Sequence, residues 1–234
     1  MFASVELRRY VMQPGRRDDL IALFDREFIE TQEERGMTAI GHYRDLDDPD
    51  AFVWFRGFDR MESRAGALHA FYVESSVWKT HRAAANDTIL DSDNVLLLRP
   101  ARAHSGFDVS GLSRPAPSFP EASASVVGVA IFTLDGPADQ AFLTAFETEV
   151  LPKLQRCSSR IAYFVTEERP NDFPRLPVRE GEPSFVVTGV CNEAADVDAW
   201  LGHFATASRP EPMHVRTSRY ERLRLEPAAR ALFR

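Results

Sequence analysis

The chain has 234 residues, of which 44% are hydrophobic and 27% are charged, a composition that excludes a disordered protein. Its formal net charge of −7 argues against a nucleic-acid-binding protein, which would usually carry a basic face. No apolar run approaches the roughly 18 residues needed to cross a bilayer, and neither a signal peptide nor an arginine-rich presequence is apparent. We therefore expect a cytoplasmic protein with no membrane span.

The first hundred residues alternate between the periodicities of strands and helices. Strands are predicted over residues 4–12, 38–46, 51–58 and 94–100. Helices are predicted over residues 16–35, from 59 towards 72, and from 75 to about 90. Asp59 and Glu62 have capping-box spacing, which predicts that the second helix begins at Asp59. The order β-α-β-β-α-β is that of the ferredoxin-like fold.

The same order returns after a segment of different composition. Residues 102–123 are rich in Gly, Pro and Ser and lack apolar periodicity, so they are predicted to be a linker. Beyond it, strands are predicted over 126–134, 160–167, 184–191 and 218–225, with helices starting near Pro137 and over 193–206. We predict an α+β fold in which two tandem ferredoxin-like domains, residues 1–101 and 124–234, form a dimeric α/β-barrel arrangement.

Several strands read as buried on both faces. "AFVWF" (51–55) and "NVLLL" (94–98) are continuous apolar runs rather than alternations. Two helices can cover one face of a four-stranded sheet, so a second sheet must cover the other. That sheet could come from the second half of this chain or from a second chain in a homodimer. Either arrangement predicts an inter-sheet space with room for a small molecule.

Four short motifs fall in order over about residues 4–101: "ELRRY" (6–10), "PGR" (14–16), "FDRMESR" (58–64) and "LLRP" (97–100). With these motifs the first half resembles the NIPSNAP family. The second half is similar to that of longer bacterial members. The resemblance implies a dimeric α/β barrel and little about chemistry. Family members often carry histidine at the position of Trp54, so no role of that histidine is carried over.

The acidic stretch "DLDDPD" (45–50) invites comparison with a calcium site. An EF-hand loop starting at Asp45 would need an oxygen ligand at 49, glycine at 50 and a carboxylate at 56. The chain has Pro49, Asp50 and Arg56 instead. Because Asp and Pro are favoured in turns, the stretch is predicted to be a solvated hairpin loop.

The strongest candidate site comes from the alternation of side chains along two strands. Glu6, Arg8 and Tyr10 share one face of the first strand, and Trp54 and Arg56 share one face of the third. We expect helices to cover the plainer aliphatic faces, which would turn these side chains into the inter-sheet space. Their proposed roles are anion or carbonyl binding for the arginines and packing of an aromatic ligand for Tyr10 and Trp54. The alternative interpretation is a paired structural network.

Other chemical signals are weaker. His42, on a predicted strand, is the candidate for proton transfer. No histidine pair has metal-ligand spacing, and no nucleophile elbow or phosphate-binding loop occurs in the sequence, so no metal and no cofactor are expected. The segment "FPRLPVRE" (173–180) could place Arg175 and Arg179 over a pocket mouth, or could simply connect two strands.

Two classes of function follow from these features. The first is a small-molecule-binding barrel protein, with a cofactor-independent oxygenase or isomerase as the enzymatic form of that hypothesis. The second is a non-catalytic interaction or stress-associated module whose interior is only core.

Overall fold

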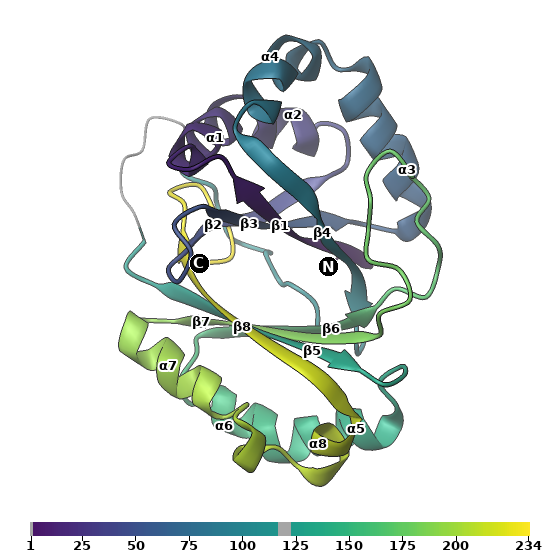
Figure 1. Ribbon diagram of the computed structural model, residues 1–234, viewed down its shortest axis with the longest axis vertical. Coiled ribbons are helices and arrows are strands. Elements are labelled where there is room, and N and C mark those ends of the chain that lie inside the picture. Colours follow the sequence, from purple (N-terminus) through teal and green to yellow (C-terminus); the bar gives the residue numbers. More distant parts are fainter. Residues whose placement is uncertain (1, 117–122) are drawn as a thin grey trace.

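Eight antiparallel strands form a closed barrel in the computed structural model, which describes residues 2–116 and 123–234 (Figure 1). The strands are β1 Ser4–Met12, β2 Thr38–Asp45, β3 Ala51–Phe58, β4 Ile89–Pro100, β5 Val126–Leu134, β6 Arg160–Thr166, β7 Ser184–Cys191 and β8 Thr217–Pro227. Their order around the barrel is β1-β3-β2-β8-β5-β7-β6-β4. The barrel therefore closes within one chain, and the fold is mixed α/β.

Helices cover the outside of this barrel in two layers (Figure 1). The layer over β1–β4 consists of α1 Arg17–Leu23, η1 Phe24–Phe28, α2 Ile29–Glu33, α3 Met61–His69, η2 Ala70–Glu74 and α4 Ser76–Asn86. The layer over β5–β8 consists of α5 Gln140–Ala145, η3 Phe146–Val150, α6 Leu151–Leu154, α7 Ala194–Gly202, η4 Thr206–Ser208 and α8 Glu211–Arg216. We call residues 2–116 the first half and residues 123–234 the second half.

Strand pairing is the same in the two halves. The first half has the order β4-β1-β3-β2 and the second has β8-β5-β7-β6, so in each case the first and third strands of the half are central. Short ladders between β2 and β8 and between β4 and β6 join the halves and close the barrel. No helix of the described ranges is both long and apolar enough to cross a membrane.

The interior of the barrel is filled with apolar side chains. Its core cluster includes Val5, Leu7, Val53, Phe55, Leu96, Leu98, Val127, Val129, Ile131, Val186, Leu223 and Leu225. These are the aliphatic faces that we expected to lie under the helices. The expected orientation of the strands was therefore wrong, because a strand buried on both faces gives no signal of which face meets the helices.

Two segments outside the strands complete this interior. Phe107, from the predicted linker 102–123, is fully buried, and its ring centroid lies 5.0 Å from that of Phe55 and 4.9 Å from that of Phe164. Phe233, near the C-terminus, lies 4.7 Å from Phe107. The predicted linker thus contributes Phe107 to the core, while residues 117–122 of it lie outside the described residues.

Most predicted elements agree with the structure to within a few residues, and the differences are local. The N-cap of α3 is Arg60 and not Asp59, and no side-chain hydrogen bond caps this helix. The helix predicted near Pro137 begins after Asp139, whose carboxylate accepts a hydrogen bond from the Phe142 amide at 2.9 Å. In the acidic loop, Asp45 and Asp48 accept hydrogen bonds from amides two residues ahead, as predicted for a turn.

Candidate functional site

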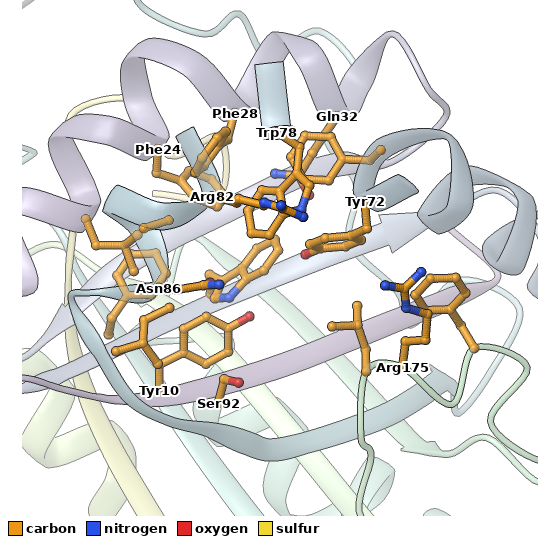
Figure 2. Close-up of a pocket in the computed structure, with 18 residues that line it drawn as sticks. Tyr10, Phe24, Phe28, Gln32, Tyr72, Trp78, Arg82, Asn86, Ser92 and Arg175 are labelled. Atoms are coloured by element: carbon orange, nitrogen blue, oxygen red, sulfur yellow. The ribbon is translucent and has the colours of Figure 1, made fainter. Parts of the chain in front are cut away.

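A cavity of about 320 Å³ lies between the first-half sheet and its helices (Figure 2). This volume is at the lower end of the range for small-molecule sites. The described residues that line it are mainly aromatic or aliphatic: Tyr10, Leu20, Phe24, Phe28, Phe52, Trp54, Phe71, Tyr72, Trp78, Ala85, Ile89, Phe173 and Leu176. The polar residues of the lining are Gln32, Arg82, Asn86, Ser92 and Arg175. The pocket is therefore suited to a flat aromatic molecule.

Tyr10 and Trp54 stand on neighbouring central strands, β1 and β3. Arg8 pairs with Trp54 in the antiparallel register, so the side chain of Tyr10 lies one step along the same face. The Tyr10 and Trp54 rings meet edge to face, with centroids 6.3 Å apart. Both side chains point to the helices, and they form the floor of the pocket.

Two tyrosine hydroxyls converge on the pocket. Figure 2 shows the hydroxyls of Tyr10 and Tyr72 directed toward one another. The Tyr10 hydroxyl accepts a hydrogen bond from Nε of Arg8 at 2.9 Å, and that of Tyr72 accepts one from Arg56 at 3.1 Å. Neither phenolic proton has an acceptor among the described residues. Each hydroxyl is therefore a free donor whose oxygen is polarised by a guanidinium group behind it.

Below the tyrosines lies a buried ionic cluster, which we call the Glu6 cluster: Glu6, Arg8, Arg56 and Arg64. Glu6 accepts hydrogen bonds from Arg8 at 2.9 Å, from Arg56 at 3.0 Å and from Arg64 at 2.8 Å. All four side chains are at most 1% exposed. Burial alone would raise the pKa of Glu6, but the coulombic effect of Arg56, Arg8 and Arg64 outweighs it and holds that pKa well below its usual range.

The Glu6 cluster carries more positive than negative charge. A single buried carboxylate faces three buried guanidinium groups, and the further carboxylate of Asp172, which pairs with Arg64, is 29% exposed. This excess favours negative charge on a group held at the tyrosines, since electrostatic interactions are strong where water is excluded. Burial raises the pKa of Tyr10, so its hydroxyl stays protonated and able to donate.

His42 lies on the same helix-facing side of the sheet but outside this pocket. Its Nε2 is 2.6 Å from Asp25, its side chain is fully buried, and no partner for Nδ1 is found in the described part of the chain. Burial lowers the pKa of His42, and the contact with Asp25 offsets only part of that effect. A neutral histidine that does not line the pocket is poorly placed for proton transfer there.

The second half also contributes to the pocket wall. The loop that joins β6 to β7 crosses the barrel and reaches α3 (Figure 1). Asp172 on this loop pairs with Arg64, and Arg169 pairs with Glu62. These contacts hold Phe173, Arg175 and Leu176 against the pocket. Of the two arginines predicted to reach a pocket mouth, Arg175 lines it, whereas Arg179 bonds Glu182 and Asn94.

The structure thus gathers four of the residues singled out from sequence, although in a different place from the one expected. Tyr10 and Trp54 line the pocket, and Arg8 and Arg56 lie behind its tyrosines. Tyr72 and Trp78 were missed because their spacing is that of ordinary helix core. The described residues contain no group of three His, Cys, Asp or Glu side chains that could hold a metal ion.

A closed barrel of this order with a pocket outside its first-half sheet defines an α/β-barrel protein with a candidate small-molecule site. Residues 5–103 match the family model of NIPSNAP, so this part of the chain is similar to the NIPSNAP family. No curated protein sequence matches the chain.

Solved structures with the same fold cover nearly the whole chain. A putative monooxygenase from Fusobacterium nucleatum is 8% identical with a TM-score of 0.60, and one from Lactobacillus acidophilus is 9% identical with a TM-score of 0.56. An anthrone oxidase-like protein is 10% identical with a TM-score of 0.52. Each likeness covers 97% of this chain and 94% of the other. At such identities the likeness shows the fold.

Proposed function

We propose that the pocket binds a planar aromatic small molecule and that Tyr10 and Tyr72 donate hydrogen bonds to one of its oxygen atoms. The observation that carries the proposal is the pair of converging hydroxyls, each backed by a buried arginine, in an otherwise aromatic pocket. Trp54, Phe24 and Phe28 would contact the faces and edges of the rings. Arg8 and Arg56 act through the tyrosines rather than on the ligand.

This arrangement suits a ligand oxygen that becomes negatively charged. A carbonyl that turns into an enolate, or a phenol that ionises, would gain from two donors and from the excess positive charge of the Glu6 cluster. Stabilising such an oxyanion is what an isomerase or a cofactor-independent oxygenase of aromatic substrates requires. The names of the similar structures, monooxygenase and anthrone oxidase-like protein, accord with this class of chemistry.

We also propose that residues 1–101 and 124–234 are tandem ferredoxin-like domains. Their identical strand orders and the short ladders that join them support this division. A homodimer would then be a further level of assembly, since the barrel needs no second chain to close.

Binding of 2-naphthol tests the proposed function. Its fluorescence and absorbance distinguish the neutral from the ionised form, and we expect saturable binding with the pKa of the bound naphthol lowered. Tyr72→Phe should weaken binding by about tenfold, because it removes one donor to a partly charged oxygen. The matched control is Tyr163→Phe, whose hydroxyl bonds Glu147 at 3.1 Å in the second half and which should leave binding unchanged.

A non-catalytic interaction module is the second candidate, and the filled barrel interior favours it. If neither 2-naphthol nor anthrone binds to a folded protein, the pocket is only a packing defect and this second function stands. Arg56→Ala would not separate the two, because removing a partner of the buried Glu6 destabilises the protein in either case.

A further inference from the structure

The only charged residues among the described residues that line the pocket are two arginines, Arg82 of α4 and Arg175 of the β6–β7 loop. Both side chains belong to exposed residues, and neither has an ion-pair partner within residues 2–116 and 123–234. Figure 2 shows Arg82 on the helix side of the pocket and Arg175 on the loop side, with Tyr72 between them.

Other arginines of this protein have carboxylate partners. Arg216 pairs with Asp135 and Asp139, and Arg224 pairs with Asp47 and Asp198. The chain as a whole carries a net charge of −7. A pocket rim that has two unneutralised guanidinium groups and no lining carboxylate is therefore a local site of positive potential, which attracts anions.

The two ends of the pocket thus differ in chemistry. The floor offers neutral phenol donors from Tyr10 and Tyr72 beside aromatic rings, and the rim offers full positive charges that water can reach. A guanidinium group is well matched to a carboxylate, which it can bond through two parallel N–H donors.

We infer that the ligand is an aromatic acid: a fused-ring phenol or ketone that carries one carboxylate away from its reacting oxygen. The ring oxygen binds Tyr10 and Tyr72, and the carboxylate binds Arg82 and Arg175 at the rim. This inference rests on the proposed function, because it uses the same pocket and adds the second end of the ligand. It also gives the second half a direct part in recognition, since Arg175 comes from the β6–β7 loop.

The test compares 2-naphthol with 6-hydroxy-2-naphthoate at neutral pH and low salt, using the full-length protein. The two probes share the phenol and the ring system and differ in one carboxylate. We expect the naphthoate to bind about tenfold more tightly, because exposed ion pairs contribute modestly and two of them act together. The preference should decline in 0.5 M salt, since exposed charges are screened.

Substitution of the rim separates this inference from the proposed function. The double variant R82Q/R175Q should bind both probes with the affinity that the wild type has for 2-naphthol. Arg156→Gln is the matched control, because Arg156 is also exposed and has no ion pair among the described residues, but lies in the second half away from the pocket. It should keep the tenfold preference.

The outcomes are distinct. Equal binding of both probes to the wild type overturns the aromatic-acid inference and leaves the proposed function intact. A preference that survives in R82Q/R175Q also overturns it, because the carboxylate would then bind elsewhere. Failure of both probes to bind overturns the proposed function itself.

Discussion

The helix-facing sides of the two half-sheets have the same strand order but bury different side chains. Counted from the start of each strand, Glu6 and Arg8 of β1 correspond to Gly128 and Ala130 of β5. Likewise, Arg56 of β3 corresponds to Gly189 of β7.

In the second half, Trp200 of α7 lies over both glycines, so that a Cβ atom would come within 2.7 Å of its ring at Gly128 and 2.8 Å at Gly189. In the second half, a tryptophan ring packs directly on the backbone of the sheet. In the first half, buried charged side chains lie between the sheet and its helices, beside the pocket.

The difference supports the proposed site in the first half. A sheet of this strand order and its helices can be packed mainly with apolar side chains, as the second half shows. The Glu6 cluster is therefore not required by the fold. Because burying charge is costly unless it is well paired, its presence under the pocket is better explained by the electrostatics it supplies to Tyr10 and Tyr72.

The largest effect is expected from Glu6→Gln. It would leave Arg8, Arg56 and Arg64 buried without their shared carboxylate, and should lower the free energy of unfolding by about 3–5 kcal/mol. Urea denaturation measures this change. Glu147→Gln is the control. Glu147 pairs with Arg102 at 2.8 Å, but the side chains of Glu147 and Arg102 are 26% and 33% exposed, so the expected cost is under about 1 kcal/mol. Equal costs for the two variants would contradict the contrast between the layers.

Trp200→Ala should have a similar effect by a different mechanism. It removes the fully buried ring that fills the second-half layer, and the lost burial together with the cavity should cost about 3–5 kcal/mol. Binding of 2-naphthol to the first-half pocket should not change in the folded variant. A loss of that binding at concentrations of denaturant where the protein is still folded would show that the two layers are coupled.

Gly189→Ala should destabilise less, by about 1–3 kcal/mol, because the new methyl group forces the Trp200 ring to shift. In the Trp200→Ala background the same substitution should cost little, since the clash is gone. Gly66→Ala is the matched control: a Cβ there meets nothing within 4 Å, and alanine favours the helix. Additive effects of Gly189→Ala and Trp200→Ala would contradict this packing.

The smallest effect concerns His42. Its pKa is lowered in the folded state, so the unfolded chain takes up a proton as the pH falls below about 6.5 while the folded chain does not. His42 therefore contributes stability above that pH and loses it as the pH falls towards the folded pKa. Denaturation curves from pH 7.5 to 5 should show a flatter pH dependence for His42→Gln than for the wild type, by at most about 1.4 kcal/mol per pH unit. An unchanged slope would contradict a neutral buried histidine.

Much of the fold could be predicted from the sequence because its strands and helices have clear periods. The shared face of Arg8, Tyr10, Trp54 and Arg56 also followed from alternation alone. Which way that face points did not, because Val5, Leu7 and Val53 on the opposite face are equally buried. The orientation is decided by the partner layer, which local sequence does not reveal.

The remaining parts of the site depend on long-range contacts. Tyr72 has the sequence signature of helix core, and its role appears only when Arg56 is seen to donate to it across the layer. Phe173 and Arg175 lie in a proline-containing segment whose reach depends on the pairing of Asp172 with Arg64, more than a hundred residues away along the chain. No local sequence pattern distinguishes a segment that lines a pocket from one that only connects two strands.

The β6–β7 loop has a consequence for how the molecule holds together. Because Phe173, Arg175 and Leu176 come from the second half and the other lining residues from the first, a bound molecule would contact both halves of the chain. Its binding energy would oppose separation of the two sheets, as for any ligand that prefers the assembled state. Occupancy of the pocket and closure of the barrel are then thermodynamically linked, so that a bound ligand would stabilise the association of the two halves.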